Sequence, residues 1–346
     1  MQAQAYAVIG SNYGDESKGH ITDYICSKHS PDFVIRFNGG SQAGHSVVTP
    51  KGERNVFHHH ASGGFLNIPT YLSEHFICNP ILFFNELQLS PTHVHPSSTV
   101  TTPLDMLINQ AIAKLDTCGV GIFETVLRSR DPKYCIKVKT IRDKSVYDRI
   151  LKEYIPKRLL NLNLFNLEFE AKWREIYFSY VEKFLDKIII SEKPKGTNFV
   201  FEGAQGLMLD QNYPGFPYLT PSNTGIKNVL ELCNEWDIKE LNPIYVSRSY
   251  LTRHGAGPLV NEQPLPNWVK DETNFENKFQ GKLRYAPLNI KELEQRIIKD
   301  HNNSTSSYKI AITCLDQKKV EDNYFLKFNY RSYGPKRNDV ECLLAP

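Results

Sequence analysis

The sequence predicts an α/β fold, a single large domain with a mainly parallel central sheet flanked by helices. Two observations carry this prediction. Short apolar runs, which are typical of buried strands, alternate along the chain with longer stretches of helical character. The 346 residues also show no internal repeat, no low-complexity linker and no clear boundary, so 1–346 is expected to be one domain.

The predicted elements follow in chain order. Strands are expected at the apolar runs 5–9, 33–37, 198–201, 244–246 and 310–312. Residues 21–26 have a helical pattern, and most of 145–191 is expected to be helical. The polar stretch 261–280, with its two prolines, is expected to be a mobile loop. The first strand, the loop 11–19 and the first helix have the order of a P-loop-like unit, in which a helix start faces an anion.

Composition excludes several classes of protein. The net charge is only +3, whereas a nucleic-acid-binding domain usually carries a strong basic stripe. No apolar run approaches the roughly 20 residues of a membrane helix, and the N-terminus lacks the pattern of a signal peptide. The seven cysteines form no C-x-x-C pair, which favours reduced thiols. We expect a cytoplasmic protein with no nucleic-acid or membrane partner.

The loop 11–19 is the first candidate site. It lacks the G-x-x-x-x-G-K-[ST] sequence of a Walker A loop. Gly14, Lys18 and Gly19 can still cradle a phosphate with backbone N–H groups and one ammonium. Asp15 is suited to bind Mg²⁺ or to act as a base. An ordinary polar turn is the alternative interpretation.

A second glycine-rich loop, at 38–45, follows the strand 33–37. Its three glycines suggest that the backbone approaches a ligand closely. His45, at the end of this loop, is a candidate acid. The run His58–His60 invites a metal site, but neighbouring residues of a strand point to opposite faces. Structural or substrate-lining roles are therefore favoured for these three histidines.

Six segments resemble the adenylosuccinate synthetase family, in the family's order and over most of the chain. The family patterns are G-D-E-G-K-G-K, Y-Q-G-G-x-N-A-G-H-T, L-H-L-x-P-S-G, F-E-G-A-Q-G, P-Y-V-T-S-S-N-T and Y-T-T-R-V-G-x-G-P. The matching segments are 14–19, 37–46, 57–63, 201–206, 217–224 and 250–258, and 201–206 matches its pattern outright. The short length is similar to that of the archaeal and phage branches.

The resemblance implies a ligase. The family phosphorylates O6 of a purine nucleotide with a nucleoside triphosphate, and L-aspartate then displaces the phosphate at C6. Asp15 resembles the catalytic aspartate, which takes the N1 proton and ligates Mg²⁺. His45 resembles the histidine that stabilises charge on O6 and on the γ-phosphoryl group, and Gly44 the carbonyl ligand of Mg²⁺.

The other site residues are implied by the same resemblance. The residues that the resemblance implies for nucleotide binding are Asn12, Gly14, Glu16, Ser17, Lys18, Gly19, Gln42, Thr117, Cys118, Gln205, Thr220 and Asp316. Those that it implies for aspartate binding are Thr252, Arg253, Gly281, Lys282 and Arg284. Arg128 (or Arg130) is expected to reach the substrate phosphate across the interface of a homodimer. Structural roles are the alternatives, such as a cap for Thr220, an ion pair for Arg253 or a surface charge for Arg128.

Four departures from the family bear on the substrates. Ser17 replaces a glycine, and its hydroxyl could bond the 2-amino group of guanine. Lys282 replaces the first arginine of G-R-x-R, which approaches the ribose 2′-hydroxyl, and it lacks the planar fork of arginine. Cys314 replaces the lysine of T-K-x-D, so GTP specificity is in doubt although Asp316 remains. Gln42 replaces an asparagine, a conservative change.

These departures resemble the phage branch that makes 2-aminoadenine DNA precursors in the host cytoplasm. The favoured hypothesis is that dGMP, aspartate and ATP give N6-succino-2-amino-2′-deoxyadenylate. The alternative is an adenylosuccinate synthetase that uses IMP and GTP. A GTPase-like regulator is disfavoured, because it would not need the aspartate-binding residues. An inactive homologue is disfavoured because Asp15, His45 and Gln205 are retained.

Overall fold

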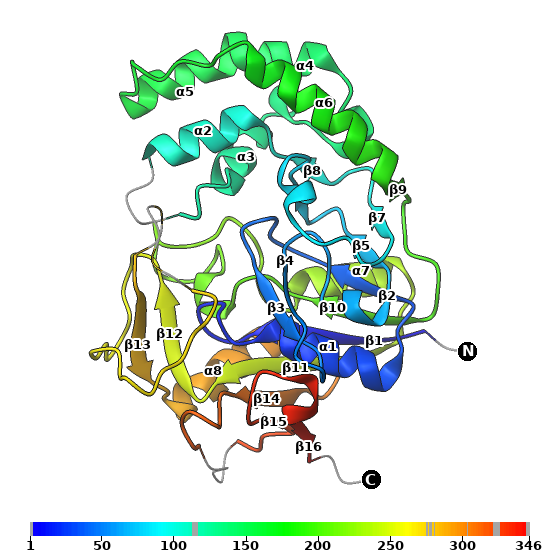
Figure 1. The fold of residues 1–346 in the computed structure, drawn as a ribbon, viewed down its shortest axis with the longest axis vertical. Coiled ribbons are helices and arrows are strands. Elements are labelled where there is room, and N and C mark those ends of the chain that lie inside the picture. The colour runs from blue at the N-terminus through cyan, green and yellow to red at the C-terminus, as the bar shows by residue number, and fades with distance from the viewer. Residues whose placement is uncertain are drawn as a thin grey trace.

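A ten-stranded sheet forms the centre of the computed structural model, which describes residues 3–112, 117–274, 276, 279, 281–302, 304–320 and 326–343 (Figure 1). The strand order is β16-β15-β14-β11-β1-β10-β2-β5-β7-β9. Neighbouring strands are parallel except β15 and β16 at one edge. The sheet confirms the predicted α/β fold class.

The strands and helices have the following bounds. The central sheet contains β1 Gln4–Gly10, β2 Phe33–Arg36, β5 Thr70–Leu72, β7 Thr92–Val94, β9 Ile188–Ile190, β10 Asn198–Glu202, β11 Glu240–Arg248, β14 Lys309–Thr313, β15 Tyr330–Ser332 and β16 Val340–Cys342. Three two-stranded sheets pair β3 His45–Val48 with β4 Arg54–Phe57, β6 Ile77–Cys78 with β8 Thr99–Val100, and β12 Tyr250–His254 with β13 Leu283–Pro287. The helices are α1 Lys18–His29, α2 Pro103–Ile112, α3 Ile122–Ser129, α4 Lys144–Arg149, α5 Ile155–Leu162, α6 Lys172–Lys187, α7 Lys227–Glu235 and α8 Ile290–His301.

Two hydrophobic layers cover opposite faces of the sheet. In β1, Ala5, Ala7 and Ile9 pack into one layer, whereas Tyr6 and Val8 between them pack into the other. This alternation has the period of two that a strand buried on both faces requires. Helices α7 and α8 contribute to the first layer, and α1 contributes to the second.

A third hydrophobic cluster joins the helices between 103 and 187 to one end of the sheet. Leu104 of α2, Tyr147 of α4 and Phe184 of α6 belong to it, together with Leu72 of β5 and Val94 of β7. In Figure 1 this helical part lies above the sheet, away from α7 and α8. None of the helices in the described ranges combines the length and hydropathy of a membrane span.

The five predicted strands are confirmed as β1, β2, β10, β11 and β14, and 144–187 is largely helical. The first helix starts at Lys18, three residues earlier than expected. Five strands of the sheet were not predicted, namely β5, β7, β9, β15 and β16. Each has only three residues, too few to show a strand period in the sequence. Of the expected mobile loop 261–280, residues 275, 277, 278 and 280 lie outside the described part.

One buried carboxylate, that of Glu86, organises the histidines His58–His60. It accepts hydrogen bonds from all three backbone N–H groups, at 2.7, 2.7 and 3.2 Å, and lies 2.9 Å from Nδ1 of His59. The other two rings contact different groups, the carbonyl of Ser41 and the hydroxyl of Thr92. No cluster of three His, Cys, Asp or Glu side chains in the described ranges is arranged to hold a metal ion. These contacts give the histidines a structural role.

We expect Glu86→Gln to lower the stability of the protein at neutral pH. Burial raises the pKa of Glu86, but hydrogen bonds and charge from His59 outweigh burial and lower the pKa to about 2. The pKa of Glu86 is lower in the folded than in the unfolded protein, so the ionised carboxylate stabilises the fold. This stabilisation is complete above about pH 4.5 and is lost as the pH falls toward 2. The free energy of unfolding should drop by roughly 3 kcal/mol at pH 7.

Urea unfolding at several pH values between 7 and 3 measures this effect. The difference between Glu86→Gln and the unmodified protein should shrink as the pH falls. Glu182→Gln is the matched control, because Glu182 forms an exposed ion pair with Arg142 and should contribute little. An equal effect of the two substitutions, or a difference that does not depend on pH, would contradict the prediction.

Candidate active site

Most of the predicted catalytic and nucleotide-binding residues lie beyond the carboxyl ends of five neighbouring parallel strands, β2, β10, β1, β11 and β14. Because the strands are parallel, the loops that follow them meet at one edge of the sheet. Ligands of open α/β sheets usually bind at this edge. The topology therefore brings together loops that are far apart in sequence, at 11–17, 37–45, 203–206 and 314–317.

A cavity of about 420 Å³ opens at this edge. Its lining includes Gly14, Asp15, Ser17, Lys18, Gly19, Gly44, His45, Ser46, Arg54, Arg248, 270–274, Thr313, Cys314 and Asp316. The two predicted catalytic residues, Asp15 and His45, thus share one cavity with the predicted donor-binding residue Asp316. The polar lining and the start of α1 fit a bound triphosphate.

The carboxylate of Glu16 points into the loop 11–19 and not toward the cavity. It accepts hydrogen bonds from the backbone N–H groups of Asn12 and Gly14, both at 2.8 Å. The ammonium of Lys18 lies 3.0 Å from the same carboxylate and donates to the carbonyl of Gly14 at 2.6 Å. Glu16 was predicted to contact the nucleotide, but its side chain does not reach the cavity. Its carboxylate instead binds groups of its own loop. Lys18 does line the cavity.

Ser17 precedes α1 in the left-handed conformation, with φ 66°. A residue with a Cβ is strained there by roughly 1 kcal/mol relative to glycine. This strain explains why a glycine is suited to the position. In the described part of the chain, the Ser17 hydroxyl makes no hydrogen bond, and it lines the cavity. It is therefore available to a ligand, next to the free N–H groups at the start of α1.

Asp15 lines the cavity with a carboxylate that makes no hydrogen bond to another described residue. Burial raises the pKa of Asp15, and the positive charge of Arg248 partly opposes this effect. A buried, unpaired carboxylate is suited to a cation or to a proton. Asp15 and Gly44, which also lines the cavity, would offer a carboxylate and a backbone carbonyl to Mg²⁺, an ion that takes oxygen ligands from few protein groups and from phosphates.

His45 is held by Glu202, the carboxylate at the end of β10. The distance from His45 Nδ1 to Glu202 Oε1 is 2.8 Å, and Ser62 donates to the same carboxylate through its hydroxyl and backbone N–H. Burial lowers the pKa of His45 to about 4 against the opposing effect of Glu202, so the neutral ring donates its Nδ1–H. Nε2 is buried and has no hydrogen-bond partner in the described structure. Nε2 is thus left for a ligand.

Arg36 completes this buried network. Its guanidinium lies 3.6 Å from Glu202 Oε2, and both side chains are fully buried. Burial by itself raises the pKa of Glu202, but His45 and Arg36 outweigh it and lower the pKa to about 2. Glu202 and Arg36 were missed as functional residues, although Glu202 lies in a segment that matches the family pattern. The available signal was a charged residue at the end of an apolar strand.

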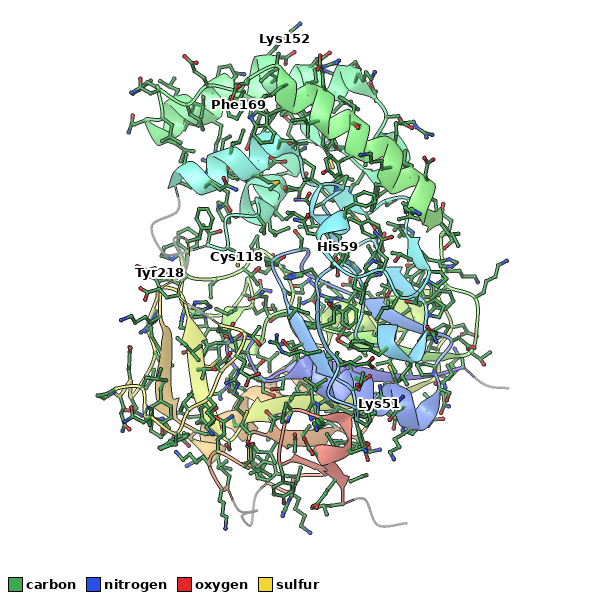
Figure 2. The ribbon with its side chains drawn as sticks, viewed as in Figure 1. Lys51, His59, Cys118, Lys152, Phe169 and Tyr218 are labelled. Carbon is green, nitrogen blue, oxygen red and sulfur yellow. The ribbon has the colours of Figure 1, made fainter. Side chains whose placement is uncertain are left out.

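A second group of predicted residues lies beside the loop 11–19. Cys118, which is labelled in Figure 2, contacts the backbone carbonyl of Gln42 through Sγ at 3.9 Å. Burial raises the pKa of Cys118 to about 11. The carboxamide nitrogen and oxygen of Gln42 are both buried without a partner in the described structure. Gln205, with φ 62°, approaches Gly14 closely, and Thr220 is only partly buried. These groups remain candidates for binding the purine nucleotide.

Asn12 and Thr117 have protein partners. The Asn12 side chain donates to Ser247 Oγ at 2.9 Å and accepts from Arg296 at 2.6 Å. The hydroxyl of Thr117 donates to Asn109 at 2.9 Å. In this structure the two side chains hold the loops 11–17 and 117–121 in place.

The structure contradicts the predicted role of Arg128. Its guanidinium is fully buried and bonds Asp105 at 2.8 and 2.9 Å, as well as the carbonyls of Tyr134 and Val100. It cannot reach a phosphate across an interface, because its donors are used inside the helical part. Arg130, the alternative, is exposed. The helical periodicity of the sequence could have predicted that Arg128 faces the buried side of α3. It could not have identified Asp105 as the ion-pair partner.

The predicted aspartate-binding residues lie on the paired strands β12 and β13 and just before β13. Arg253 and Arg284 are paired across the two strands. Arg253 donates to the carbonyls of Pro258 and Tyr218, and Arg284 forms a bidentate ion pair with Glu262. The two guanidinium groups therefore lie on neighbouring strands, that of Arg253 buried and that of Arg284 paired with Glu262. Thr252 is buried, Gly281 is partly buried and Lys282 is exposed.

The sequence of the chain is similar to those of known enzymes. A model of the adenylosuccinate synthetase family matches residues 7–317. An adenylosuccinate synthetase of Borrelia turicatae is 28% identical over 333 residues, which cover 90% of this chain and 76% of that protein. One of Clostridium botulinum is 27% identical over 360 residues, which cover 95% of this chain and 82% of that protein.

Two solved structures share the fold. The fully ligated adenylosuccinate synthetase from Plasmodium falciparum has a TM-score of 0.71 and 19% identity, covering 98% of this chain and 86% of that chain. The succinoaminodeoxyadenylate synthetase of cyanophage S-2L, bound to dGMP and to dATP as an energy donor, also has a TM-score of 0.71, with 14% identity. The second match covers 99% of this chain and 96% of that chain. At these identities the similarity shows the fold alone.

Proposed function

The chain belongs to the adenylosuccinate synthetase family, and from this premise we propose that it condenses L-aspartate with C6 of dGMP, using ATP. Members of the family are carbon–nitrogen ligases that use Mg²⁺ and a nucleoside triphosphate. The observation that carries the choice of dGMP is the hydroxyl of Ser17, which lies at the cavity and makes no hydrogen bond to another described residue. On guanine, N1–H and the 2-amino group are neighbours, so Asp15 at N1 would leave Ser17 near the amino group.

The proposed reaction has two steps. Asp15 takes the proton from N1 of the purine, O6 attacks the γ-phosphorus of the triphosphate, and the nucleoside diphosphate leaves. The amine of aspartate then attacks C6, the C6–O6 bond breaks, and phosphate leaves with the oxygen and with the proton that the amine loses. The product is N6-succino-2-amino-2′-deoxyadenylate. Asp15 and Gly44 would hold Mg²⁺, which neutralises charge on the triphosphate.

The geometry of His45 supports a role at the transferred phosphoryl group. With Nδ1–H donated to Glu202, the ring of His45, a residue of the cavity lining, keeps a buried Nε2 that has no hydrogen-bond partner among the described residues. The ring is neutral in the free protein, because burial lowers the pKa of His45 to about 4. A bound triphosphate adds negative charge, which favours the imidazolium. We infer that His45 becomes a donor to the phosphoryl oxygens only when the nucleotides are bound.

Aspartate is proposed to bind at Arg253 and Arg284. The fork of Arg284 is occupied by the carboxylate of Glu262 in this structure. A substrate carboxylate presents the same bidentate acceptor and would take the place of Glu262. Lys282, with a single ammonium, would add charge without a second fork. Its weaker match to the family arginine supports a nucleotide that lacks the 2′-hydroxyl.

ATP is proposed as the phosphate donor because the donor end of the cavity departs from the family pattern. Cys314 lines this end in a left-handed conformation, with φ 61°, where the family has lysine. Asp316 is exposed at the same end and retains the carboxylate that would bond guanine. GTP is therefore the alternative donor, in an enzyme that acts on IMP. The retained Asp316 favours this second candidate, as do the similar bacterial adenylosuccinate synthetases.

A substrate assay decides between the two candidates. Purified protein is mixed with aspartate and Mg²⁺, with dGMP or IMP, and with ATP or GTP, and the succinyl product is followed by mass spectrometry. The proposal predicts turnover of dGMP with ATP. Turnover of IMP without turnover of dGMP would refute it, and would identify an adenylosuccinate synthetase.

Ser17→Gly is expected to change substrate preference while stabilising the protein. The substitution relieves a left-handed residue, so the free energy of unfolding should rise by up to about 1 kcal/mol. Loss of one neutral hydrogen bond should lower kcat/KM for dGMP roughly three- to tenfold. The value for IMP, which lacks the 2-amino group, should not fall. An unchanged ratio of the two values would show that Ser17 does not bind the amino group.

A homodimer is also proposed, since the resemblance implies an arginine that crosses an interface. With Arg128 buried inside its own chain, Arg130 is the exposed candidate. Light scattering during gel filtration would test the dimer, and a monomer at assay concentrations that remains fully active would contradict it.

A further inference from the structure

A short segment, Lys270–Asn274, crosses one side of the cavity, and we refer to it as the strap. All five residues line the cavity. The strap is organised around the carboxylate of Asp271, which accepts the backbone N–H groups of Thr273 and Asn274 at 2.9 and 2.8 Å. The side chain of Asn274 donates to the same carboxylate at 3.0 Å. The strap is thus a turn closed on its own acidic residue.

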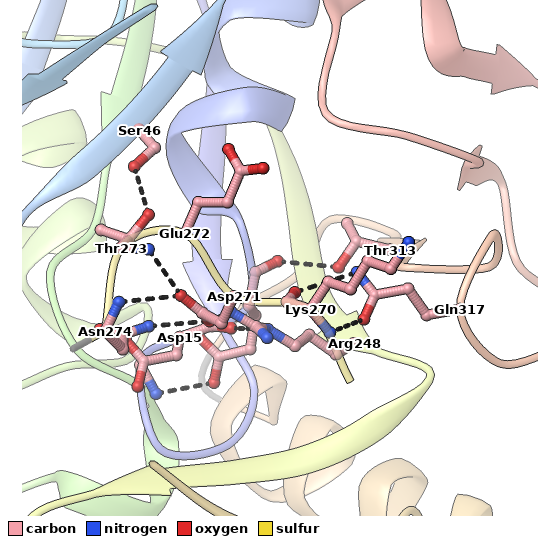
Figure 3. Close-up of polar contacts among 12 residues, drawn as sticks. Asp15, Ser46, Arg248, Lys270, Asp271, Glu272, Thr273, Asn274, Thr313 and Gln317 are labelled. Atoms are coloured by element: carbon pink, nitrogen blue, oxygen red, sulfur yellow. Dashed lines mark hydrogen bonds and ion pairs between the residues drawn. The ribbon is translucent and has the colours of Figure 1, made fainter. Parts of the chain in front are cut away.

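Three parts of the molecule hold the strap, as Figure 3 shows for Arg248, Ser46 and Gln317. Arg248 donates to Asp271 at 2.7 Å. The hydroxyl of Thr273 lies 3.1 Å from Ser46 Oγ and also accepts from Arg54 at 2.8 Å. At its other end, the backbone N–H of Lys270 donates to the Gln317 side chain at 2.9 Å. Each partner belongs to a different element at the edge of the cavity.

Arg248 connects the strap to the catalytic loop. It is the last residue of β11, and only 8% of it is exposed. Its Nε donates to the backbone carbonyl of Asp15, while its terminal nitrogen donates to Asp271. The planar fork of one guanidinium therefore fixes two segments 256 positions apart in sequence, Asp15 and Asp271. A lysine has only one nitrogen for these two acceptors.

Stability alone does not account for this pair. A buried ion pair often contributes no more to folding than apolar side chains of similar volume, because both charges lose their water. Burial by itself raises the pKa of Asp271, and the charge of Arg248 lowers it to about 2, so the carboxylate stays ionised at the cavity wall. An ion pair at this place instead holds two segments of the active site in a fixed relation.

We propose that Arg248 is a positioning residue for phosphoryl transfer, which fixes the backbone of Asp15 and holds the strap against the bound triphosphate. The inference rests on the proposed function. It assigns Arg248 no contact with the reacting atoms. Its effect passes through Asp15 and Asp271, and small displacements of a catalytic group lower rates by about 100-fold.

Kinetics of Arg248→Met, Arg248→Lys and Asp271→Asn test the proposal, with the nucleotide pair that the unmodified enzyme turns over. We expect kcat to fall about 100-fold for Arg248→Met and about tenfold for Arg248→Lys, which keeps the charge and one contact. Asp271→Asn frees the strap but leaves Arg248 at Asp15, so the KM for the triphosphate should rise more than kcat falls. The KM for aspartate should change less than threefold in all three variants.

The buried pair of Arg128 and Asp105 supplies the matched control. It has the same kind of ion pair, at 2.8 Å, in the helical part and away from the cavity. Asp105→Asn should lower the melting temperature without changing kcat per folded molecule. If Arg248→Lys and Asp271→Asn behave like this control, Arg248 has a structural role only and the proposal is overturned. Those two variants decide the matter if Arg248→Met does not fold.

Hydrogen exchange gives a readout that does not depend on turnover. The amides of Thr273 and Asn274 are bonded to Asp271, so they should exchange slowly in the unmodified protein. Faster exchange of a peptide covering the strap is expected in Arg248→Lys, whereas Asp105→Asn should leave it unchanged. If the unmodified protein turns over neither nucleotide, the proposed function fails, and this exchange still shows whether Arg248 holds the strap. Unchanged exchange in Arg248→Lys would overturn that connection.

Discussion

Asp15→Asn is expected to lower kcat by about 1,000-fold or more, the upper part of the range for loss of a general base. The carboxylate lines the cavity without a hydrogen-bond partner among the described residues, so its charge is free for the substrate and for a cation. Asparagine has nearly the same shape but cannot take the N1 proton. The measurement is steady-state formation of the succinyl product by mass spectrometry.

Stability should not fall with activity in this variant. Burial raises the pKa of Asp15, which means that the folded protein disfavours the charged form. Replacing the carboxylate by a neutral amide should leave the melting temperature unchanged or raise it, a trade-off typical of active sites. Asp32→Asn is the matched control, since Asp32 precedes β2 at the opposite end of the strands and should not affect kcat. Retained activity in Asp15→Asn would refute its role as base.

Glu202→Gln is expected to damage both folding and catalysis. Arg36, fully buried at 3.6 Å from Glu202, would lose its negative partner, which costs about 3–5 kcal/mol for a buried pair. The amide can also present its NH₂ group to His45 Nδ1, which favours the other tautomer and a rotated ring. We expect kcat per folded molecule to fall by about 100-fold, as found when the orienting partner of an active-site histidine is lost.

Two further variants separate the effects on folding and on catalysis. Adding Arg36→Met to Glu202→Gln removes both buried charges, so it should restore much of the free energy of unfolding but not kcat. Ser62→Ala removes one hydroxyl hydrogen bond to the carboxylate and should cost about 1–2 kcal/mol, with kcat within threefold. If kcat recovers together with stability in the double variant, Glu202 does not orient His45.

The loops that carry the site could be located from the sequence because each follows a strand that is visible locally. The predicted strands 5–9, 33–37 and 198–201 end directly before Gly10, Asn38 and Glu202, and family patterns lie on or beside the loops that follow. In a parallel sheet the carboxyl ends of neighbouring strands share one edge. The joint cavity of Asp15 and His45 follows from that topology.

The same reasoning could not decide which of two adjacent carboxylates faces the ligand. Asp15 and Glu16 are neighbours, but the backbone N–H groups of Asn12 and Gly14 turn Glu16 into the loop. That choice depends on backbone dihedral angles, including the positive φ of Ser17, which composition and spacing do not report. The structure therefore places the loop at the cavity, as the pattern predicts, whereas the carboxylate of Glu16 points into the loop.

The sequence by itself determined the family, the fold class and the positions of Asp15 and His45, because these depend on residue type and on local order along the chain. Only the tertiary structure decided what holds the two residues and what lies outside the site. It paired His45 with Glu202, 157 positions away, it bonded Arg248 to the backbone carbonyl of Asp15, and it buried Arg128 against Asp105. The physical reason is that a buried charge must find its partner in space, and that partner is set by packing between distant segments.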